Sequence, residues 1–324
     1  MFRVRDLEGD GGEIRALKRL KDDRRVGRIE NEMAALQRVK HPNVVELIDY
    51  HVSGKPPYYL VTEWLDGGTL SDCVQAYKGD IVRSLELFLS ICDGVYAAHV
   101  ADVIHRDLKP DNILFRTLSG EPVVTDFGLC WVYGDERFTA SQEHVGAFRY
   151  MAPELEDGRL DRPTPQCDVY SLGKVLYYIV SGGTEFNREK HRDPQYDLRR
   201  RFAGCLSPVQ TTQMEYISEL LDHMIAYDPS HRYPSVFDAR AALETVRKLV
   251  TDGQYPFTDH MPCKFCGQGT YKRHQRGRGN FAQNLLTYDH SNISVAILVC
   301  TNCGHLQFFD SDAFQRDPKR AELQ

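Results

Sequence analysis

The segment His105-Arg106-Asp107-Leu108-Lys109-Pro110-Asp111-Asn112 concentrates charged and amide side chains in eight consecutive residues. A helical apolar pattern over residues 84–100 precedes the segment, and the apolar run Ile113-Leu114-Phe115 follows it. These patterns predict a regular element on each side and a loop between them. The polar side chains of the segment are therefore expected on a loop that is held between rigid elements.

Two further motifs follow in order. Asp126-Phe127-Gly128 comes fourteen residues after Asn112, and Ala152-Pro153-Glu154 comes later. Together the three motifs resemble those of eukaryotic-type (Hanks-type) serine/threonine protein kinases. One such motif would be a weak signal, but several in the right order make a chance match improbable. The resemblance implies an α+β, two-lobed protein-kinase-like fold in which a truncated N-lobe sheet precedes a helical C-lobe.

The resemblance also implies roles for the loop residues. Asp107 matches the residue that accepts the proton of the substrate hydroxyl, and Lys109 matches the lysine that approaches the transferring phosphate. Asn112 and Asp126 match the magnesium ligands, and their oxygen donors suit this hard cation. Phosphoryl transfer depends mostly on positioning and charge stabilisation, which these residue types supply. The implied reaction moves the γ-phosphate of ATP to a hydroxyl of a protein substrate.

A lysine upstream is implied to bind the nucleotide. Ala16-Leu17-Lys18 resembles the lysine strand of the family, so Lys18 would hold the α- and β-phosphates of ATP and pair with a helix glutamate. Glu30 and Glu32 are both candidates, and the position of Leu36 one turn further along the apolar face favours Glu32. The alternative is a solvated ion pair without a role in nucleotide binding.

The segment Val61-Thr62-Glu63-Trp64-Leu65 resembles the hinge between the lobes. There the main chain of Glu63 and Leu65 would contact adenine, and Thr62 would line the pocket behind it.

Other matches imply structural or regulatory roles. Asp168 resembles the aspartate that anchors the catalytic loop, and Arg232 resembles the arginine that pairs with Glu154. Arg106 resembles the arginine that meets a phosphate on the activation loop. The candidate acceptors of that phosphate are Thr139 and Ser141, for which ordinary loop hydroxyls are the alternative.

The sequence departs from the family pattern at two places. Its only glycines ahead of Lys18 are Gly9, Gly11 and Gly12, which are expected in a turn between two strands, so the glycine-rich loop over the phosphates is missing. Either the start was assigned too late, the chain is truncated, or the natural protein works without the loop. The second departure is Ala147, where the family usually has a threonine. Both favour the alternative of a pseudokinase, a nucleotide-sensing or scaffolding module.

Four of the nine cysteines form two CxxCG pairs near the C-terminus. Cys263 and Cys266 are separated from Cys300 and Cys303 by 33 residues. Such pairs suit tetrahedral Zn²⁺, and the segment resembles a zinc ribbon. Alternating apolar residues over 295–299 predict a strand that leads into the second pair. The basic residues of 264–278 suit a nucleic-acid or protein partner, with a solvated loop as the alternative, and the run Arg199–Arg201 has the same ambiguity.

Composition limits the remaining possibilities. With 42% hydrophobic residues, 27% charged residues and a net charge of −6, the chain lacks the basic excess of a dedicated nucleic-acid binder. Its apolar runs are far shorter than the roughly 20 residues of a membrane helix. No signal peptide pattern is present. We expect a cytoplasmic protein with no membrane partner.

Periodicity outlines the domains. Strands are predicted over 2–7, 13–20, 44–51 and 58–65, and helices over 26–39, 84–100, 166–181, 211–226 and 235–250. The expected organisation is a kinase-like domain over 1–250, with the N-lobe over 1–63 and the C-lobe over 66–250. A zinc ribbon over 256–310 and a tail over 311–324 complete the chain.

Overall fold

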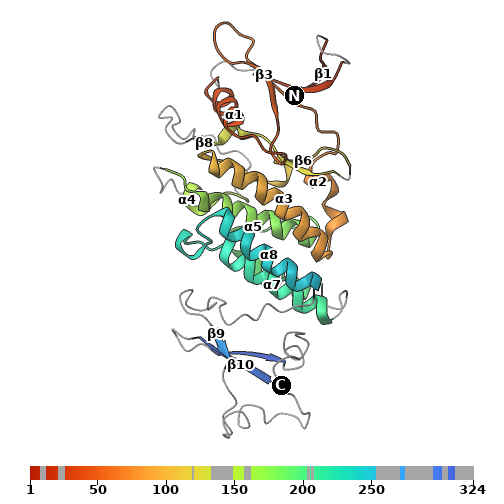
Figure 1. The fold of residues 1–324 in the computed structure, drawn as a ribbon, viewed down its shortest axis with the longest axis vertical. Helices are drawn as coiled ribbons and strands as arrows, with labels where there is room; N and C mark the ends of the chain where they lie inside the picture. The colour runs from red at the N-terminus through yellow and green to blue at the C-terminus, as the bar shows by residue number, and fades with distance from the viewer. Residues whose placement is uncertain are drawn as a thin grey trace, which may run out of the picture. The chain divides into compact units, whose positions relative to one another are not determined.

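The computed structural model describes most of the first 252 residues and three short strands after them. The described residues are 1–7, 12–20, 26–118, 120–132, 149–156, 162–202, 205, 208–252, 271–273, 295–300 and 306–310. The chain divides into two units, Met1–Arg247 and Lys248–Gln324 (Figure 1).

The first unit opens with a four-stranded antiparallel sheet of order β1-β2-β4-β3. Its strands are β1 (Phe2–Arg5), β2 (Ile14–Arg19), β3 (Leu47–His51) and β4 (Tyr59–Glu63). The four predicted strands are thus confirmed. β1 and β2 pair from Phe2 opposite Leu17 to Arg5 opposite Ile14, so the glycine-containing segment joins two paired strands. Gly12 has a φ of +64°, which glycine adopts at little cost.

Helix α1 (Val26–Arg38) packs on this sheet through one apolar face. Ile29 from the helix joins Leu60 of β4 and Val52, the residue after β3, in a buried cluster. The helix ends before His41-Pro42, as expected where the residue ahead of a proline disfavours helical backbone. This packing fixes the position of the helix that carries Glu32.

The C-lobe is built mainly of helices. Its α-helices are α2 (Leu70–Cys73), α3 (Ile81–Val100), α4 (Pro153–Glu156), α5 (Pro165–Ser181), α6 (Leu198–Arg201), α7 (Pro208–Met224) and α8 (Val236–Asp252). Short 3-10 turns are η2 (Val74–Tyr77), η3 (Pro110–Asn112), η4 (Phe127–Leu129), η5 (Lys190–Arg192) and η6 (Pro229–His231). The four long helices predicted here, α3, α5, α7 and α8, are confirmed, and Figure 1 shows them stacked below the sheet.

Helix α5 forms the centre of the C-lobe. It packs against both α3 and α7, and nearly all of its residues are buried, including Tyr170 and Tyr177. Pro165 stands at its first turn, and Gly182 ends it with a φ of +70°, so both ends follow ordinary helix chemistry. A buried central helix gives a rigid base for the loops above it.

The C-lobe also contains two short antiparallel ladders, and a linker after β4 joins it to the N-lobe. β5 (Val103–Ile104) pairs with β8 (Trp131–Val132), and β6 (Ile113–Phe115) pairs with β7 (Pro122–Val124). The linker after β4 runs beside β6, where the Gly67 N–H donates to the Phe115 carbonyl at 2.9 Å. A Cβ at Gly67 would lie 2.2 Å from the Thr117 carbonyl oxygen, so only glycine permits this approach.

The second unit contains a three-stranded antiparallel sheet of order β11-β10-β9. Its strands are β9 (Tyr271–Arg273), β10 (Val295–Cys300) and β11 (Leu306–Asp310). The predicted strand leading into the second cysteine pair is confirmed as β10. Cys263, Cys266 and Cys303 lie outside the described residues. Among the helices that the structure describes, none has the length and apolar character needed to span a bilayer.

Candidate active site

Lys18, Glu32 and Asp126 meet between the sheet and the C-lobe. Lys18 Nζ donates to Glu32 Oε2 at 2.6 Å and to Asp126 Oδ1 at 2.8 Å. β2 supplies the lysine, α1 the glutamate, and the turn before η4 the aspartate, which has a φ of 60°. A Cβ at Gly128 would stand only 3.3 Å from Asp126 Oδ1 and 3.5 Å from Glu32 Oε2, so glycine leaves room for this cluster.

The charges of this cluster stabilise one another. Burial lowers the pKa of the Lys18 ammonium, but the two nearby carboxylates outweigh burial and hold that pKa above its ordinary value. Burial raises the pKa of Glu32, and Lys18 offsets only part of the rise. Burial also acts to raise the pKa of Asp126, yet Lys18 holds it below its usual range. The lysine is therefore a fixed positive charge at this site.

Asp107, Lys109 and Asn112 form a second cluster on the loop quoted first. Lys109 Nζ donates to Asp107 Oδ2 at 2.8 Å, and Asn112 Nδ2 donates to the same oxygen at 3.0 Å and to the Asp107 carbonyl at 2.8 Å. Asp107 is 7% exposed. Its other carboxylate oxygen, Oδ1, is buried and has no hydrogen-bond partner among the described residues. The carboxylate is thus fixed on one side and available on the other.

Asp168 holds this loop from below. The fully buried carboxylate accepts the backbone N–H of His105 at 2.8 Å and of Arg106 at 2.9 Å, and it bonds to His99 Nε2 at 2.8 Å. Burial acts to raise the pKa of Asp168, but the contact with His99 keeps that pKa below its usual range. These bonds fix the backbone at Arg106, whose φ is 67°.

Two histidines support this site. His105, the first residue of the polar loop, bonds through Nε2 to the Thr125 carbonyl at 3.0 Å, and His99 bonds to Asp168. Sequence reasoning assigned neither of them a role. His99 lies near the end of a predicted helix, a few residues before the loop, and nothing local to it distinguishes it from a surface histidine.

Glu154 and Arg232 form a buried pair beneath the site. Arg232 donates through both terminal nitrogens to the two oxygens of Glu154, at 2.7 and 2.8 Å. It also donates to the carbonyls of Gln166, Ala226 and Tyr227. Every N–H of the guanidinium therefore has an acceptor, which is the arrangement that makes a buried charge tolerable.

The hinge residues lie where β4 meets the linker. Glu63 is the last residue of β4, and Leu65 follows it in the linker. The Glu63 N–H donates to the Glu46 carbonyl at 3.1 Å, and Thr62 Oγ1 donates to the Glu63 carbonyl at 3.2 Å. The structure thus puts this segment at the junction of the two lobes.

Arg106 belongs to the loop that Asp168 holds, and its side chain is partly buried. Its Nε has no hydrogen-bond partner among the described residues, and burial lowers the pKa of the guanidinium. Thr139, Ser141 and Ala147 lie outside the described residues.

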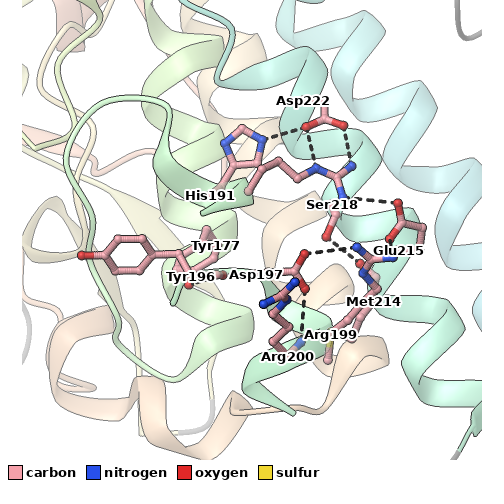
Figure 2. Close-up of polar contacts among 11 residues, drawn as sticks. Tyr177, His191, Tyr196, Asp197, Arg199, Arg200, Met214, Glu215, Ser218 and Asp222 are labelled. Carbon is pink, nitrogen blue, oxygen red and sulfur yellow. Dashed lines mark hydrogen bonds and ion pairs between the residues drawn. The ribbon is translucent and has the colours of Figure 1, made fainter. Parts of the chain in front are cut away.

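The basic run on α6 is held largely by neighbouring groups (Figure 2). Arg199 pairs with Asp197 at 3.2 Å and with Glu215 at 3.0 Å, while Arg201 donates to Thr184 Oγ1 at 2.7 Å. Figure 2 also shows His191 bonding to Asp222 of α7, at 2.8 Å. The same carboxylate accepts a hydrogen bond from Arg192 Nε at 2.9 Å. Arg199 and Arg201 thus have partners within the chain, and all three arginines of the run are exposed.

The oxygen donors near Lys18 fit a magnesium ion that is shared with phosphates. Asp126 offers a carboxylate and Asn112 an amide oxygen. Within the part of the chain that the structure describes, no cluster of three or more His, Cys, Asp or Glu side chains could hold a metal by itself. Mg²⁺ commonly takes one or two carboxylates plus substrate phosphates and water, so this sparse donor set fits it.

Known proteins resemble this chain over its first unit. A family profile described as the protein kinase domain matches residues 4–245. The chain is 36% identical over 189 residues to serine/threonine-protein kinase PkaA of Streptomyces coelicolor, covering 56% of this chain and 34% of that protein. It is 28% identical over 233 residues to serine/threonine-protein kinase PrkC of Bacillus subtilis, covering 69% of this chain and 34% of that protein. The chain thus spans about a third of the length of these relatives.

Proposed function

The chain belongs to the protein kinase family, and from that premise we propose that it is a serine/threonine protein kinase acting on protein substrates. The observation that carries the proposal is the state of Asp107. Lys109 and Asn112 hold one carboxylate oxygen, while the buried second oxygen has no partner among the described residues. A substrate hydroxyl would satisfy that oxygen.

The proposed reaction follows from this placement. The substrate hydroxyl donates its proton toward Asp107 Oδ1 as its oxygen forms a bond to the γ-phosphorus of ATP. The bond from that phosphorus to the bridging oxygen breaks, and ADP leaves. Lys109 stands beside Asp107 and offers a positive charge to the phosphoryl group in transit, while Lys18 holds the α- and β-phosphates.

Magnesium would be held by Asp126 and Asn112 together with the nucleotide phosphates. When bound, the ion neutralises phosphate charge. Lys18 already donates to Asp126 Oδ1, and this bond fixes the orientation of the carboxylate.

A radiolabelled ATP transfer assay tests the proposal. Asp107→Ala should abolish label transfer to the chain itself and to a mixed protein acceptor, because it removes the proton acceptor. Glu86→Gln, an exposed change on α3, is the matched control and should transfer as the unsubstituted protein does. Equal transfer by the protein and its Asp107→Ala variant would reject the assignment.

One sequence feature favours a pseudokinase as the second candidate. Ala147 cannot make the hydroxyl bridge that the family's threonine makes. This candidate requires nucleotide binding without transfer. ADP binding by calorimetry, combined with no label transfer from the unsubstituted protein, would establish it in place of the kinase.

We also propose that phosphate on Thr139 or Ser141 binds Arg106. The Nε of this partly buried guanidinium has no hydrogen-bond partner among the described residues, and a phosphate accepts such bonds strongly. The phosphate would order the segment between η4 and α4. Intact-mass analysis and peptide mapping of active protein that find neither residue modified would refute this.

For the second unit we propose a zinc ribbon whose ligands are Cys263, Cys266, Cys300 and Cys303. Cys300 ends β10 and pairs in register with Tyr271, the first residue of β9. The chain therefore enters β9 at the end of the sheet where it leaves β10. The first cysteine pair precedes β9 in the sequence and the second begins at the last residue of β10, which supports one shared metal. A protein or nucleic-acid partner of this ribbon is proposed from its basic residues.

A further inference from the structure

Arg116 follows β6 in the C-lobe, and its side chain contacts two segments of the opposite lobe. Nη1 pairs with the Glu63 carboxylate at the end of β4. Nη2 donates at 2.6 Å to the Pro42 carbonyl, in the connection between α1 and β3. The Arg116 carbonyl also accepts the N–H of Asp66 in the linker, at 3.2 Å. One residue therefore connects three segments that surround the hinge.

Both carboxylate oxygens of Glu63 have a partner. One carboxylate oxygen receives Arg116, and the other accepts the N–H of Glu46 at 3.0 Å. The Glu63 side chain is 12% exposed and that of Arg116 is 35% exposed. An ion pair fixes the orientation of its partners better when one of them is largely shielded from water and when the donor is a forked guanidinium.

The linker beyond Glu63 is fixed on the same surface of the C-lobe. The Gly67 N–H donates to the Phe115 carbonyl at 2.9 Å, and the Phe115 N–H donates to the Gly68 carbonyl at 3.0 Å. The segment between Glu63 and Gly67 is therefore held at both ends, by the Arg116 side chain and by β6. Removing the guanidinium would take away the side-chain contact at the end nearer β4, where the Glu63 N–H remains bound to the Glu46 carbonyl.

We infer that Arg116 is a positioning residue for the nucleotide, an inference that rests on the proposed kinase function. By holding Glu63, it fixes the main chain of residues 63–65 in the orientation that would receive adenine. Its fork reaches the Glu63 carboxylate and the Pro42 carbonyl together, which a lysine cannot do with one nitrogen in the same geometry.

The test compares Arg116→Gln with a matched control, Arg240→Gln. Arg240 is 36% exposed and pairs with Asp93, so its loss removes a similar ion pair that lies between α3 and α8. Arg116→Gln should raise the calorimetric Kd for ADP and the KM for ATP about five- to tenfold. The kcat at saturating ATP should change by less than about twofold, because the groups around Asp107 remain. Arg240→Gln should leave all three values unchanged.

A double-mutant cycle separates positioning from general loss of structure. If Arg116 acts through Glu63, the double variant Arg116→Gln with Glu63→Gln should bind ADP as Arg116→Gln alone does. Arg116→Lys retains the charge and should bind ADP with an intermediate Kd. Unchanged ADP binding in Arg116→Gln, or an equal loss in Arg240→Gln, would overturn the inference. ADP binding without phosphate transfer by the unsubstituted protein would refute the kinase proposal alone, since the Kd comparison would still decide the role of Arg116.

Discussion

Lys174 is a buried cation in the middle of α5, with 3% of its surface exposed. Its ammonium donates to the carbonyls of Phe186 and Arg188, both at 2.8 Å, and stands 3.7 Å from the centre of the Phe186 ring. Burial lowers the pKa of Lys174 to about 7, although the carboxylates of Glu189 and Glu185 act to raise it. Near neutral pH this side chain therefore holds its proton less firmly than it does in the unfolded chain.

The stability of the first unit should consequently rise with pH. Above the folded pKa of about 7 and below the ordinary value of 10.5, the unfolded chain binds more protons at Lys174 than the folded protein does. Below this pH window Lys174 is charged in both states, so the folded protein bears the full cost of burying the charge. As the pH rises through the window, the folded protein loses the proton and this cost disappears. Its contribution should be about 2 kcal/mol between roughly pH 7 and 9.

Lys174→Met should remove this pH dependence. Urea unfolding at a series of pH values, followed by the fluorescence of Trp64 and Trp131, measures the first unit alone because the chain has only these 2 tryptophans. The free energy of unfolding of the variant, subtracted from that of the unsubstituted protein, should increase from pH 7 to pH 9. Parallel pH profiles for the two proteins would contradict the assignment.

Replacement by lysine should lower the free energy of unfolding much more at Arg232 than at Arg199. The Arg232 side chain is 0% exposed, and all its N–H groups are used, so the single ammonium of Arg232→Lys cannot replace its bonds to both Glu154 oxygens and to three carbonyls. The free energy of unfolding should fall by about 3 kcal/mol or more. Arg199 is 48% exposed, and Arg199→Lys should cost less than about 1 kcal/mol. Similar losses in both variants, by the same unfolding assay, would show that burial does not set the cost.

At the scale of elements, helix α1 decides which glutamate meets Lys18. Its buried face contains Ile29, Glu32 and Leu36, whereas Glu30 lies off that face and is only partly buried. Glu32→Gln should lower kcat/KM about ten- to a hundredfold, because Lys18 loses a charged partner at 2.6 Å. Glu30→Gln makes the same chemical change at a residue off the buried face of α1, and it should leave kcat/KM unchanged. Steady-state kinetics with varied ATP measures both, and equal effects would place the partner elsewhere.

The long elements were predictable because each carries a repeated apolar pattern. α1, α3, α5, α7 and α8 bury continuous stripes, so periodicity locates them to within a few residues. The ladders β5–β8 and β6–β7 contain only two or three residues per strand, which is too few to show an alternating apolar pattern in the sequence. Their existence depends on the packing of distant segments, which a local pattern does not contain.

The site divides in the same way. Asp107, Asn112 and Asp126 stand in ordered motifs, so their chemistry could be inferred from residue type and spacing. His99 and Arg116 could not, because neither stands in a motif that the family resemblance supplies, as Asp168 and Arg232 do. Each bonds to a residue more than fifty positions away, Asp168 and Glu63 respectively. Supporting side chains outside such motifs are recognised only once the fold is known.

At the scale of the whole molecule, the two units depend on different sources of stability. The first buries a large apolar core around α5, including residues as large as Tyr170, Tyr177 and Phe88. The second is small, and its described part is a three-stranded sheet. Small folds commonly need a metal or disulfides in place of a large core. A structural zinc would supply much of the folding free energy of the second unit.

Removing one cysteine of the proposed zinc site should therefore unfold the second unit and spare the first. Metal analysis should find one zinc per chain in the unsubstituted protein and none in Cys263→Ser, whose residues 256–310 should become sensitive to protease. The tryptophan-monitored unfolding midpoint, which reports the first unit, should stay unchanged. Cys205→Ser, at an exposed cysteine of the first unit, is the control and should retain the zinc. A zinc-free protein whose second unit resists protease, or zinc retained at full occupancy by Cys263→Ser, would contradict the four-cysteine site.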